Sequence, residues 1–183
     1  MQRVCIIGST GSGKSTLARA VSARLCLPRV ELDALHWDPD WTEAPDNVFR
    51  ERVNTAVAGD RWVVDGNYSS VHDLTIERAD TIVWIDLPFP RTLQRLVART
   101  FRRWWTHEEL WCGNRERLAT QFFSRDSIFY WLITTYPRRK RQYPILLATC
   151  CERGQATFRL RSQGEIDAWV RTLVQPAATP NAL

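Results

Sequence analysis

Short apolar runs alternate along the chain with longer amphipathic segments. The apolar runs predict five buried strands, over 3–7, 29–32, 62–64, 81–85 and 156–160. Between and after them, apolar positions three or four residues apart predict helices over 14–26, 46–58, 90–105, 114–136 and 165–174, with Pro137 ending the fourth. Strands that alternate with helices are typical of an α/β fold, so we expect a three-layer sandwich whose parallel sheet has about five strands.

The length and composition of the chain agree with one globular domain. With 183 residues, 44% of them hydrophobic, we expect a single domain over 1–175 and a frayed tail over 176–183. The opening apolar run, Val4–Ile7, is too short for a signal peptide, and no run is long enough to span a membrane, so we expect a cytoplasmic protein. The five cysteines form no C-x-x-C pair, which argues against a zinc site.

The most specific motif is a glycine-rich loop between the first predicted strand and the first predicted helix. It reads G-x-x-x-x-G-K-S over Gly8, Ser9, Thr10, Gly11, Ser12, Gly13, Lys14 and Ser15, with Thr16 following. Glycines let backbone N–H groups turn inward around an anion, and the helix directs the positive end of its dipole at that anion. This motif is typical of a P-loop, which predicts that these nine residues bind ATP. Lys14 would reach the β- and γ-phosphates and the Ser15 hydroxyl would bind Mg²⁺.

The residues that end the later strands favour transfer over hydrolysis. P-loop motors commonly place Glu after a strand-end Asp to polarise water, whereas here Gly66 follows Asp65 and Leu87 follows Asp86. The chain also has no N-K-x-D motif to recognise guanine. Both absences favour phosphoryl transfer from ATP to a second substrate, which would make the protein a small-molecule kinase.

Four stretches carry a more specific resemblance: IIGSTGSGKSTLA, ELDALHWDPDW, WVVDGNY and ERADTIVWIDLP. They resemble the adenylate-kinase-related P-loop proteins, including those of the topology-modulation type. The resemblance implies a nucleoside-kinase-like phosphotransferase that uses ATP and Mg²⁺. It also implies that Asp65 binds the Mg²⁺ ion through water.

The same resemblance implies an arginine-rich helical lid, with a helical insertion, over about 95–141. Adenylate kinases carry two arginines seven and eleven residues after a strand-end proline, and Arg95 and Arg99 stand at these offsets from Pro88. The resemblance implies that Arg95 lies against the adenine and Arg99 on the phosphates, with Arg103 or Arg117 as a further lid arginine. Apolar residues occupy the opposite face of this helix, namely Leu93, Leu96, Val97, Phe101 and Trp104, and the alternative is a solvated basic stripe.

The identity of the acceptor stays open at this stage. Asn67 and Tyr68 stand where adenylate kinases have a phosphate-gripping F-P-R sequence, which argues against a nucleoside monophosphate. Asp33 ends the second predicted strand, where shikimate-type and uridine-type kinases place an aspartate that orients or deprotonates a hydroxyl. The alternative is that Asp33 caps a turn and that Trp37 and Trp41 are packing residues. The classes of acceptor that stay open are a nucleoside, a nucleotide or another hydroxyl compound.

The charge distribution suggests a second function. Residues 91–141 hold twelve basic and four acidic residues, a net charge of +8, whereas the whole chain has +5. The basic run Arg138–Arg141 lies near aromatic residues that could stack on bases, so the alternative is a nucleotide-dependent nucleic-acid-binding protein that modulates DNA topology. We favour the kinase because the basic helix after the fourth predicted strand has the spacing of lid arginines.

Overall fold

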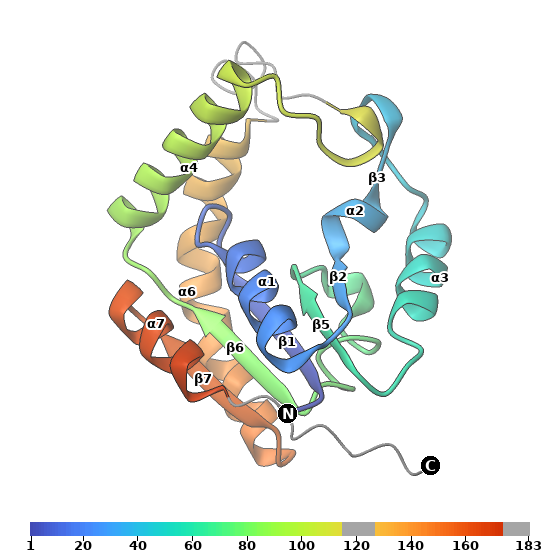
Figure 1. The fold of residues 1–183 in the computed structure, drawn as a ribbon, viewed down its shortest axis with the longest axis vertical. Coiled ribbons are helices and arrows are strands. Elements are labelled where there is room, and N and C mark those ends of the chain that lie inside the picture. Colours follow the sequence, from blue (N-terminus) through green and yellow to red (C-terminus); the bar gives the residue numbers. More distant parts are fainter. Residues whose placement is uncertain (115–126, 174–183) are drawn as a thin grey trace, which may run out of the picture.

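The computed structural model describes residues 1–114 and 127–173 (Figure 1). Its centre is a parallel five-stranded sheet in the order β2-β5-β1-β6-β7. The strands are β1 (Arg3–Gly8), β2 (Arg29–Glu31), β5 (Trp62–Asp65), β6 (Thr81–Ile85) and β7 (Ala156–Leu160). The predicted α/β class and all five strands are therefore confirmed. A small antiparallel hairpin, β3 (Trp37–Asp38) and β4 (Thr42–Glu43), lies beyond β2.

Helices cover both faces of this sheet, as the alternation of elements predicts. One face carries α1 (Lys14–Leu25) and α7 (Gln163–Thr172), and the other carries α3 (Asp46–Ala56) and α6 (Ile128–Glu152). The remaining elements are α2 (Leu32–His36), α4 (Phe89–Trp105) and the 3-10 turns η1 (Pro39–Trp41), η2 (Ser69–Val71) and η3 (Trp111–Gly113).

The alternation of side chains along β1 divides the core into two layers. Val4 and Ile6 pack with α1 and α7, whereas Cys5 and Ile7 pack with α3 and α6. All four side chains are completely buried. A strand buried on both faces reads as a continuous apolar run, which is why the sequence pattern identified it.

The course of α6 differs from the sequence prediction, which placed a helix over 114–136. Asn114 is extended rather than helical, and residues 115–126 lie outside the described part of the chain. The helix begins at Ile128, where the Ser127 hydroxyl accepts a hydrogen bond from the Phe129 N–H, and it continues through Pro137 and Pro144. The prediction that Pro137 ends the helix was therefore wrong. The predicted tail over 176–183 also lies outside the described residues.

Tertiary contacts on both sides of Pro137 explain why the helix continues. The Tyr136 hydroxyl donates a hydrogen bond of 3.0 Å to the carbonyl oxygen of Leu87, and the Tyr143 side chain is buried against Trp84. Between them, the Lys140 ammonium lies 2.6 Å from a carboxylate oxygen of Asp86. These contacts offset the lost backbone hydrogen bond and the steric clash that a proline brings to a helix interior.

Asp86 joins three elements at one end of the sheet. Its buried carboxylate follows β6 and accepts two hydrogen bonds from the Arg159 guanidinium of β7, of 2.7 and 2.8 Å, in addition to the Lys140 contact from α6. The Arg159 guanidinium also lies 4.4 Å from the centre of the Trp84 ring. This cluster fixes α6 against the edge of the sheet.

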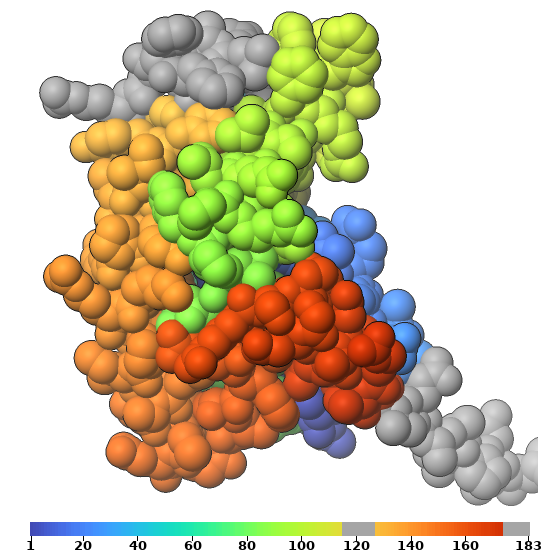
Figure 2. All heavy atoms as spheres, turned by 90° about the vertical axis from the view of Figure 1, so that its left-hand side faces the viewer, coloured from blue at the N-terminus to red at the C-terminus, as the bar shows by residue number. Residues whose placement is uncertain are grey.

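The helix α4 projects beyond the sheet and packs beside α6 (Figure 2). Its buried residues are Thr92, Leu96 and Thr100. Val97, Phe101 and Trp104, which the sequence pattern placed on an apolar face, are between 37% and 56% exposed. That pattern therefore does not mark a core-facing side, because α4 has no sheet beneath it. In the described ranges, no helix combines the length and apolarity that crossing a membrane requires.

We expect Asp86→Ala to lower the free energy of unfolding by about 2–3 kcal/mol. This is slightly less than the usual cost of breaking a fully buried ion pair, since Lys140 and Arg159 remain about one-third exposed. Chemical denaturation measures the change. Asp73→Ala, which breaks the exposed pair with Arg50, is the matched control and should change the stability much less. Equal effects of the two substitutions would contradict an anchoring role for Asp86.

Candidate functional site

The P-loop has a shape that its glycines make possible. Gly11 has a φ of 76°, and a Cβ there would lie 2.8 Å from the carbonyl oxygen of Thr92 and 2.9 Å from the Cβ of Leu96. Helix α4 therefore approaches the loop so closely that a side chain at residue 11 does not fit. Gly13 has a φ of 100° and precedes the first residue of α1. The loop thus opens at the N-terminus of a helix, where backbone N–H groups favour an anion.

Lys14 lies at the centre of a group of charged side chains from distant parts of the chain. Its ammonium donates a hydrogen bond of 3.1 Å to the carbonyl oxygen of Ser9. The Lys14 pKa is lowered to about 8, chiefly by burial and also by the positive charges of Arg139 and Arg99, whereas Asp33 and Asp65 act in the opposite direction. Asp33, Asp65 and Arg99, three site residues proposed from the sequence, therefore lie within electrostatic range of Lys14, and so does Arg139.

Ser15 and Asp65 are adjacent, which matters for the predicted Mg²⁺ site. The Ser15 hydroxyl is hydrogen-bonded to the Asp65 carboxylate, and the buried Oδ2 atom of Asp65 has no hydrogen-bond partner among the described residues but lies 3.6 Å from the Arg29 guanidinium. Burial raises the pKa of Asp65, and the Asp33 charge raises it as well, although Lys14 and Arg29 act in the opposite direction. A hydroxyl beside a carboxylate with a spare oxygen fits Mg²⁺, which takes its other ligands from phosphates and water.

Arg95 and Arg99 point from α4 to different parts of the loop. Arg95 donates hydrogen bonds to the carbonyl oxygen of Ser12, at 3.2 Å, and to the side-chain oxygen of Gln163, at 2.5 Å. It thus connects the P-loop with the N-terminus of α7, on the side away from Asp33. Arg99 lines the cleft and lies within electrostatic range of Lys14. The two arginines therefore face the loop and do not form a uniformly solvated stripe.

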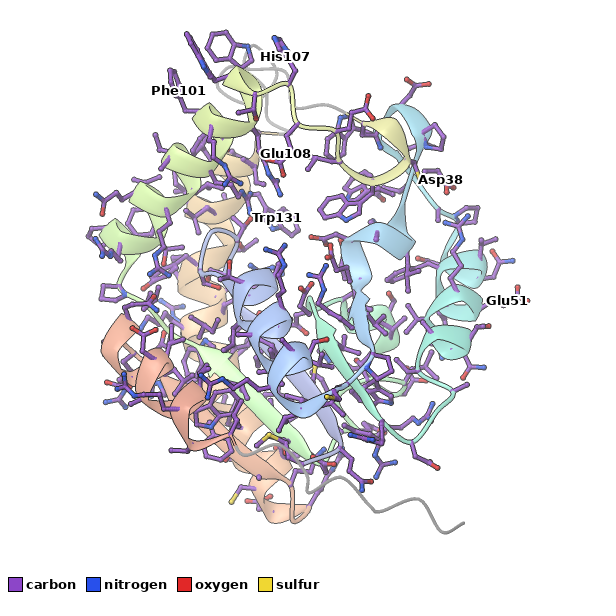
Figure 3. All side chains as sticks on the ribbon, in the orientation of Figure 1. Asp38, Glu51, Phe101, His107, Glu108 and Trp131 are labelled. Atoms are coloured by element: carbon purple, nitrogen blue, oxygen red, sulfur yellow. The ribbon has the colours of Figure 1, made fainter. Side chains whose placement is uncertain are left out.

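The other proposed lid arginines have separate positions. Arg103 and Arg102 both lie near the Glu108 carboxylate, at 3.6 and 3.4 Å, and both line the cleft. Arg117 lies outside the described residues. Figure 3 shows Glu108 below the end of α4, whereas Phe101 lies on the outer side of that helix.

The basic run of residues 138–141 divides among several environments because it lies within α6. Arg138 and Arg139 line the cleft, Lys140 contacts Asp86, and Arg141 is exposed. The Arg139 guanidinium also lies 6.0 Å from the centre of the Trp131 ring, which faces the cleft (Figure 3). A surface for nucleic acid would need these charges on one exposed face, and α6 does not present them so.

Asp33 lies in α2 and not at the end of β2, as the sequence analysis expected. The strand ends at Glu31, so Asp33 occupies the first turn of the short helix that follows. The Tyr68 hydroxyl donates a hydrogen bond of 2.6 Å to its carboxylate. Burial raises the Tyr68 pKa far above its usual value, and the Asp33 charge raises it further, so that Tyr68 stays protonated. Sequence analysis treated Tyr68 only as a departure from a family pattern and missed this contact.

A chain of hydrogen bonds extends from His72 through Asn67 to Tyr143 of α6. The Asn67 amide donates to the Tyr143 hydroxyl at 2.8 Å, and its oxygen lies 2.5 Å from the His72 Nε2 atom. All of these residues line the cleft. Tyr143 and His72 were not identified from the sequence, because their only signal is proximity to residues that are distant along the chain.

A tightly bonded turn closes the far side of the cleft. The buried Asn114 amide donates to the carbonyl oxygen of Asp38 at 2.9 Å, and its side-chain oxygen accepts from the Trp41 N–H at 3.0 Å. The Trp111 indole N–H donates to the Glu31 carboxylate at 3.0 Å. The segment that follows α4 is therefore attached to the hairpin β3–β4 across the cleft, near the top of Figure 1.

The cleft that these elements enclose is large. Its volume is about 2760 Å³, well above the roughly 300–1,000 Å³ of a site for one small ligand. It extends from the P-loop to Asp33 and Tyr68, and from α4 to the β3–β4 hairpin. It therefore has room for a nucleotide and a second substrate together.

Comparison by sequence finds a distant relative. The chain is 25% identical over 130 residues, 70% of its length, to the uncharacterized protein YqaC of Bacillus subtilis (strain 168), and the match covers 72% of that protein. No family model matches the chain.

Comparison by structure finds small-molecule kinases. Shikimate kinase from Bacteroides thetaiotaomicron is 16% identical, with a TM-score of 0.53 over 94% of this chain and 96% of that one. Shikimate kinase from Acinetobacter baumannii, in complex with shikimate, is 13% identical, with a TM-score of 0.56 over 93% and 89%. A sugar kinase from Janibacter sp. HTCC2649 is 16% identical, with a TM-score of 0.50 over 94% of each chain. The chain thus has the fold of P-loop small-molecule kinases.

Proposed function

We propose that this protein is a small-molecule kinase of the adenylate-kinase-related, topology-modulation type. It would transfer the γ-phosphoryl group of ATP·Mg²⁺ to a hydroxyl compound. One observation carries the proposal: the P-loop lysine, a carboxylate across the cleft and two arginines from different helices line one cleft and lie within electrostatic range of the lysine. The domain would cover residues 1–175, with a lid and helical insertion over about 95–141.

The donor half of the cleft is suited to a nucleotide triphosphate. The backbone N–H groups of the P-loop and the Lys14 ammonium would hold the β- and γ-phosphates. Arg95 would lie beside the adenine, since it bonds Ser12 and Gln163 at the end of the loop away from Asp33. Ser15 directly and Asp65 through water would hold Mg²⁺, which would neutralise part of the phosphate charge.

The acceptor half is suited to a hydroxyl group. Asp33 faces the P-loop lysine and has one oxygen engaged by the Tyr68 hydroxyl, which orients the carboxylate. In the transfer, the acceptor oxygen forms a bond to the γ-phosphorus while the bond from phosphorus to the bridging oxygen of ADP breaks. Asp33 takes the hydroxyl proton and later releases it to solvent.

Arg99 and Arg139 would stabilise the charge on the group being transferred. They lie within electrostatic range of Lys14 and come from α4 and α6, so that cations from two helices would meet the phosphoryl group. Fixed cations that meet developing charge in a cleft contribute more than they do in water. Arg139 adds to the arginines that the sequence analysis chose from α4 alone.

Lys14→Ala should reduce ATP turnover to background, because it removes the cation that contacts the β- and γ-phosphates. Calorimetry should also show that the wild type binds ATP·Mg²⁺ and that the variant binds it more weakly. The thermal unfolding temperature of the variant should stay near that of the wild type. Absence of ATP binding by the wild type at millimolar nucleotide would refute the proposed function.

Asp33→Asn should leave ATP binding within about threefold, roughly 0.6 kcal/mol, and lower phosphoryl transfer about a hundredfold or more. The assay would use an acceptor selected by thermal shift in the presence of an ATP analogue. Asp38→Asn is the matched control: Asp38 follows Asp33 closely but pairs with Arg52 outside the cleft lining. If Asp33→Asn instead abolished ATP·Mg²⁺ binding, Asp33 would belong to the metal site.

Arg139→Ala should lower kcat more than it weakens ATP binding, since a group that acts mainly in the transition state behaves this way. We expect a loss of about a hundredfold in kcat. Arg141→Ala, on the same helix but exposed, should leave kcat close to that of the wild type. An unchanged kcat in the Arg139 variant would remove this residue from the transfer step.

A further inference from the structure

The walls of the cleft differ in charge. The wall from the P-loop and α4 is basic, with Lys14, Arg95, Arg99, Arg102 and Arg103. The opposite wall, formed by residues between 31 and 77, contributes four acidic residues and neither lysine nor arginine. These are Glu31, Asp33, Glu43 and Glu77. A nucleotide triphosphate matches the first wall, and the second wall would repel another anion.

The arginines close to the acidic wall are engaged elsewhere. Arg50 donates to the carbonyl oxygen of Ser70 and to both carboxylate oxygens of Asp73, and Arg52 donates to Asp38 and to the carbonyl oxygen of Leu35. Neither lines the cleft. Arg50 and Arg52 therefore do not offset the charge of Asp33 for an anionic acceptor.

Arg29 and the arginines of α6 also have identified contacts or positions. Arg29 pairs with Glu31 and lies 3.6 Å from Asp65, and it is not part of the cleft lining. From α6, Arg153 pairs with Glu77 at 3.3 Å, and Arg138 and Arg139 line the cleft, with Arg139 beside Lys14. The cation paired with Glu31 is thus Arg29, which lies outside the cleft lining and leaves the cleft side of Glu31 to Trp111.

Aromatic rings line that same space. Trp37 and Trp41 pack edge to face with ring centres 5.6 Å apart, and Trp111 is held by its hydrogen bond to Glu31. All three tryptophans line the cleft. The faces of tryptophan rings attract cations, most strongly where water is partly excluded, and a neighbouring carboxylate adds to that attraction.

We propose that the phosphoryl acceptor is a hydroxyl compound that carries an ammonium group, such as an amino alcohol or an amino sugar. This inference rests on the proposed kinase function. The ammonium group lies between Glu31 and the three tryptophans, and the hydroxyl group lies at Asp33, two residues along the chain. The acceptor oxygen bonds to the γ-phosphorus, ADP leaves, and the hydroxyl proton passes to Asp33. The ammonium group keeps its protons and its charge throughout.

The test compares compounds that share a scaffold and differ in charge. One series is glucosamine, glucose and glucuronate, and a second is ethanolamine, ethylene glycol and glycolate. Binding of each to the full chain is measured by thermal shift titration with Mg²⁺ and a non-hydrolysable ATP analogue, and ADP formation is measured with ATP. In each series we expect the ammonium compound to bind about tenfold more tightly than the neutral compound, and the carboxylate to bind least.

Substitution of Glu31 separates charge recognition from general binding. Glu31→Gln keeps an oxygen that can accept from Trp111 and should reduce the preference for the ammonium compound to within about threefold of the neutral one. Glu51→Gln is the control, because Glu51 is exposed on α3 and points away from the cleft (Figure 3). This control should keep the full preference.

Each outcome decides the inference. The inference would be overturned if the carboxylate compound bound as tightly as the neutral one or more tightly. Equal affinities for the three charge classes would also overturn it. Phosphorylation of glucuronate or glycolate in preference to the amines would overturn the inference but leave the kinase function standing. Failure of the wild type to bind ATP·Mg²⁺ would instead refute the kinase function itself, so the two failures are distinguishable.

Discussion

The contact of Asp86 with Lys140 and Arg159 is the interaction on which the arrangement of the cleft depends. It joins the ends of β6 and β7 to the middle of α6. Because α6 contains two prolines, its own backbone hydrogen bonds hold it less firmly than those of an uninterrupted helix. The anchored residue, Lys140, directly follows Arg139 and precedes Tyr143 by one helical turn. Fixing Lys140 therefore fixes the cation beside Lys14 and the hydroxyl that bonds Asn67.

Local signals were sufficient to predict the sheet and the P-loop. The central strands β1, β5 and β6 are nearly continuous apolar runs, and the loop has a motif that can be read from adjacent residues. The failures all involve contacts between distant segments. Pro137 reads as a helix end unless Asp86 and Leu87 are known to face the helix, and Tyr68 reads as a departure until Asp33 is placed 2.6 Å away. The apolar residues of α4 were misjudged for the same reason, since amphipathicity does not show whether a sheet lies beneath a helix.

The charges around Lys14 are balanced for a ligand that carries several negative charges. Arg99 and Arg139 disfavour the protonated lysine, and the pKa of about 8 reflects this together with burial. Phosphates between these three cations would reverse the effect, because each negative oxygen favours the charged form of the lysine. The negative charges of Asp33 and Asp65 act in the opposite direction: they raise the pKa of Lys14 and so favour its protonated form in the absence of a nucleotide.

One short segment connects the two halves of the cleft. At one end, Glu108 lies beside Arg102 and Arg103 of α4, and at the other end Asn114 bonds the β3–β4 hairpin. Between them, Trp111 bonds Glu31 on the acidic wall. A ligand that engages Glu31 therefore acts on the same segment that holds the arginines of α4. The Asn114 amide is buried with both of its polar atoms bonded, so its loss would remove a hydrogen bond from the backbone of Asp38 and one from the backbone of Trp41. The acidic wall thus takes part of its shape from Asn114, a residue outside the cleft lining, which joins the segment after α4 to the hairpin.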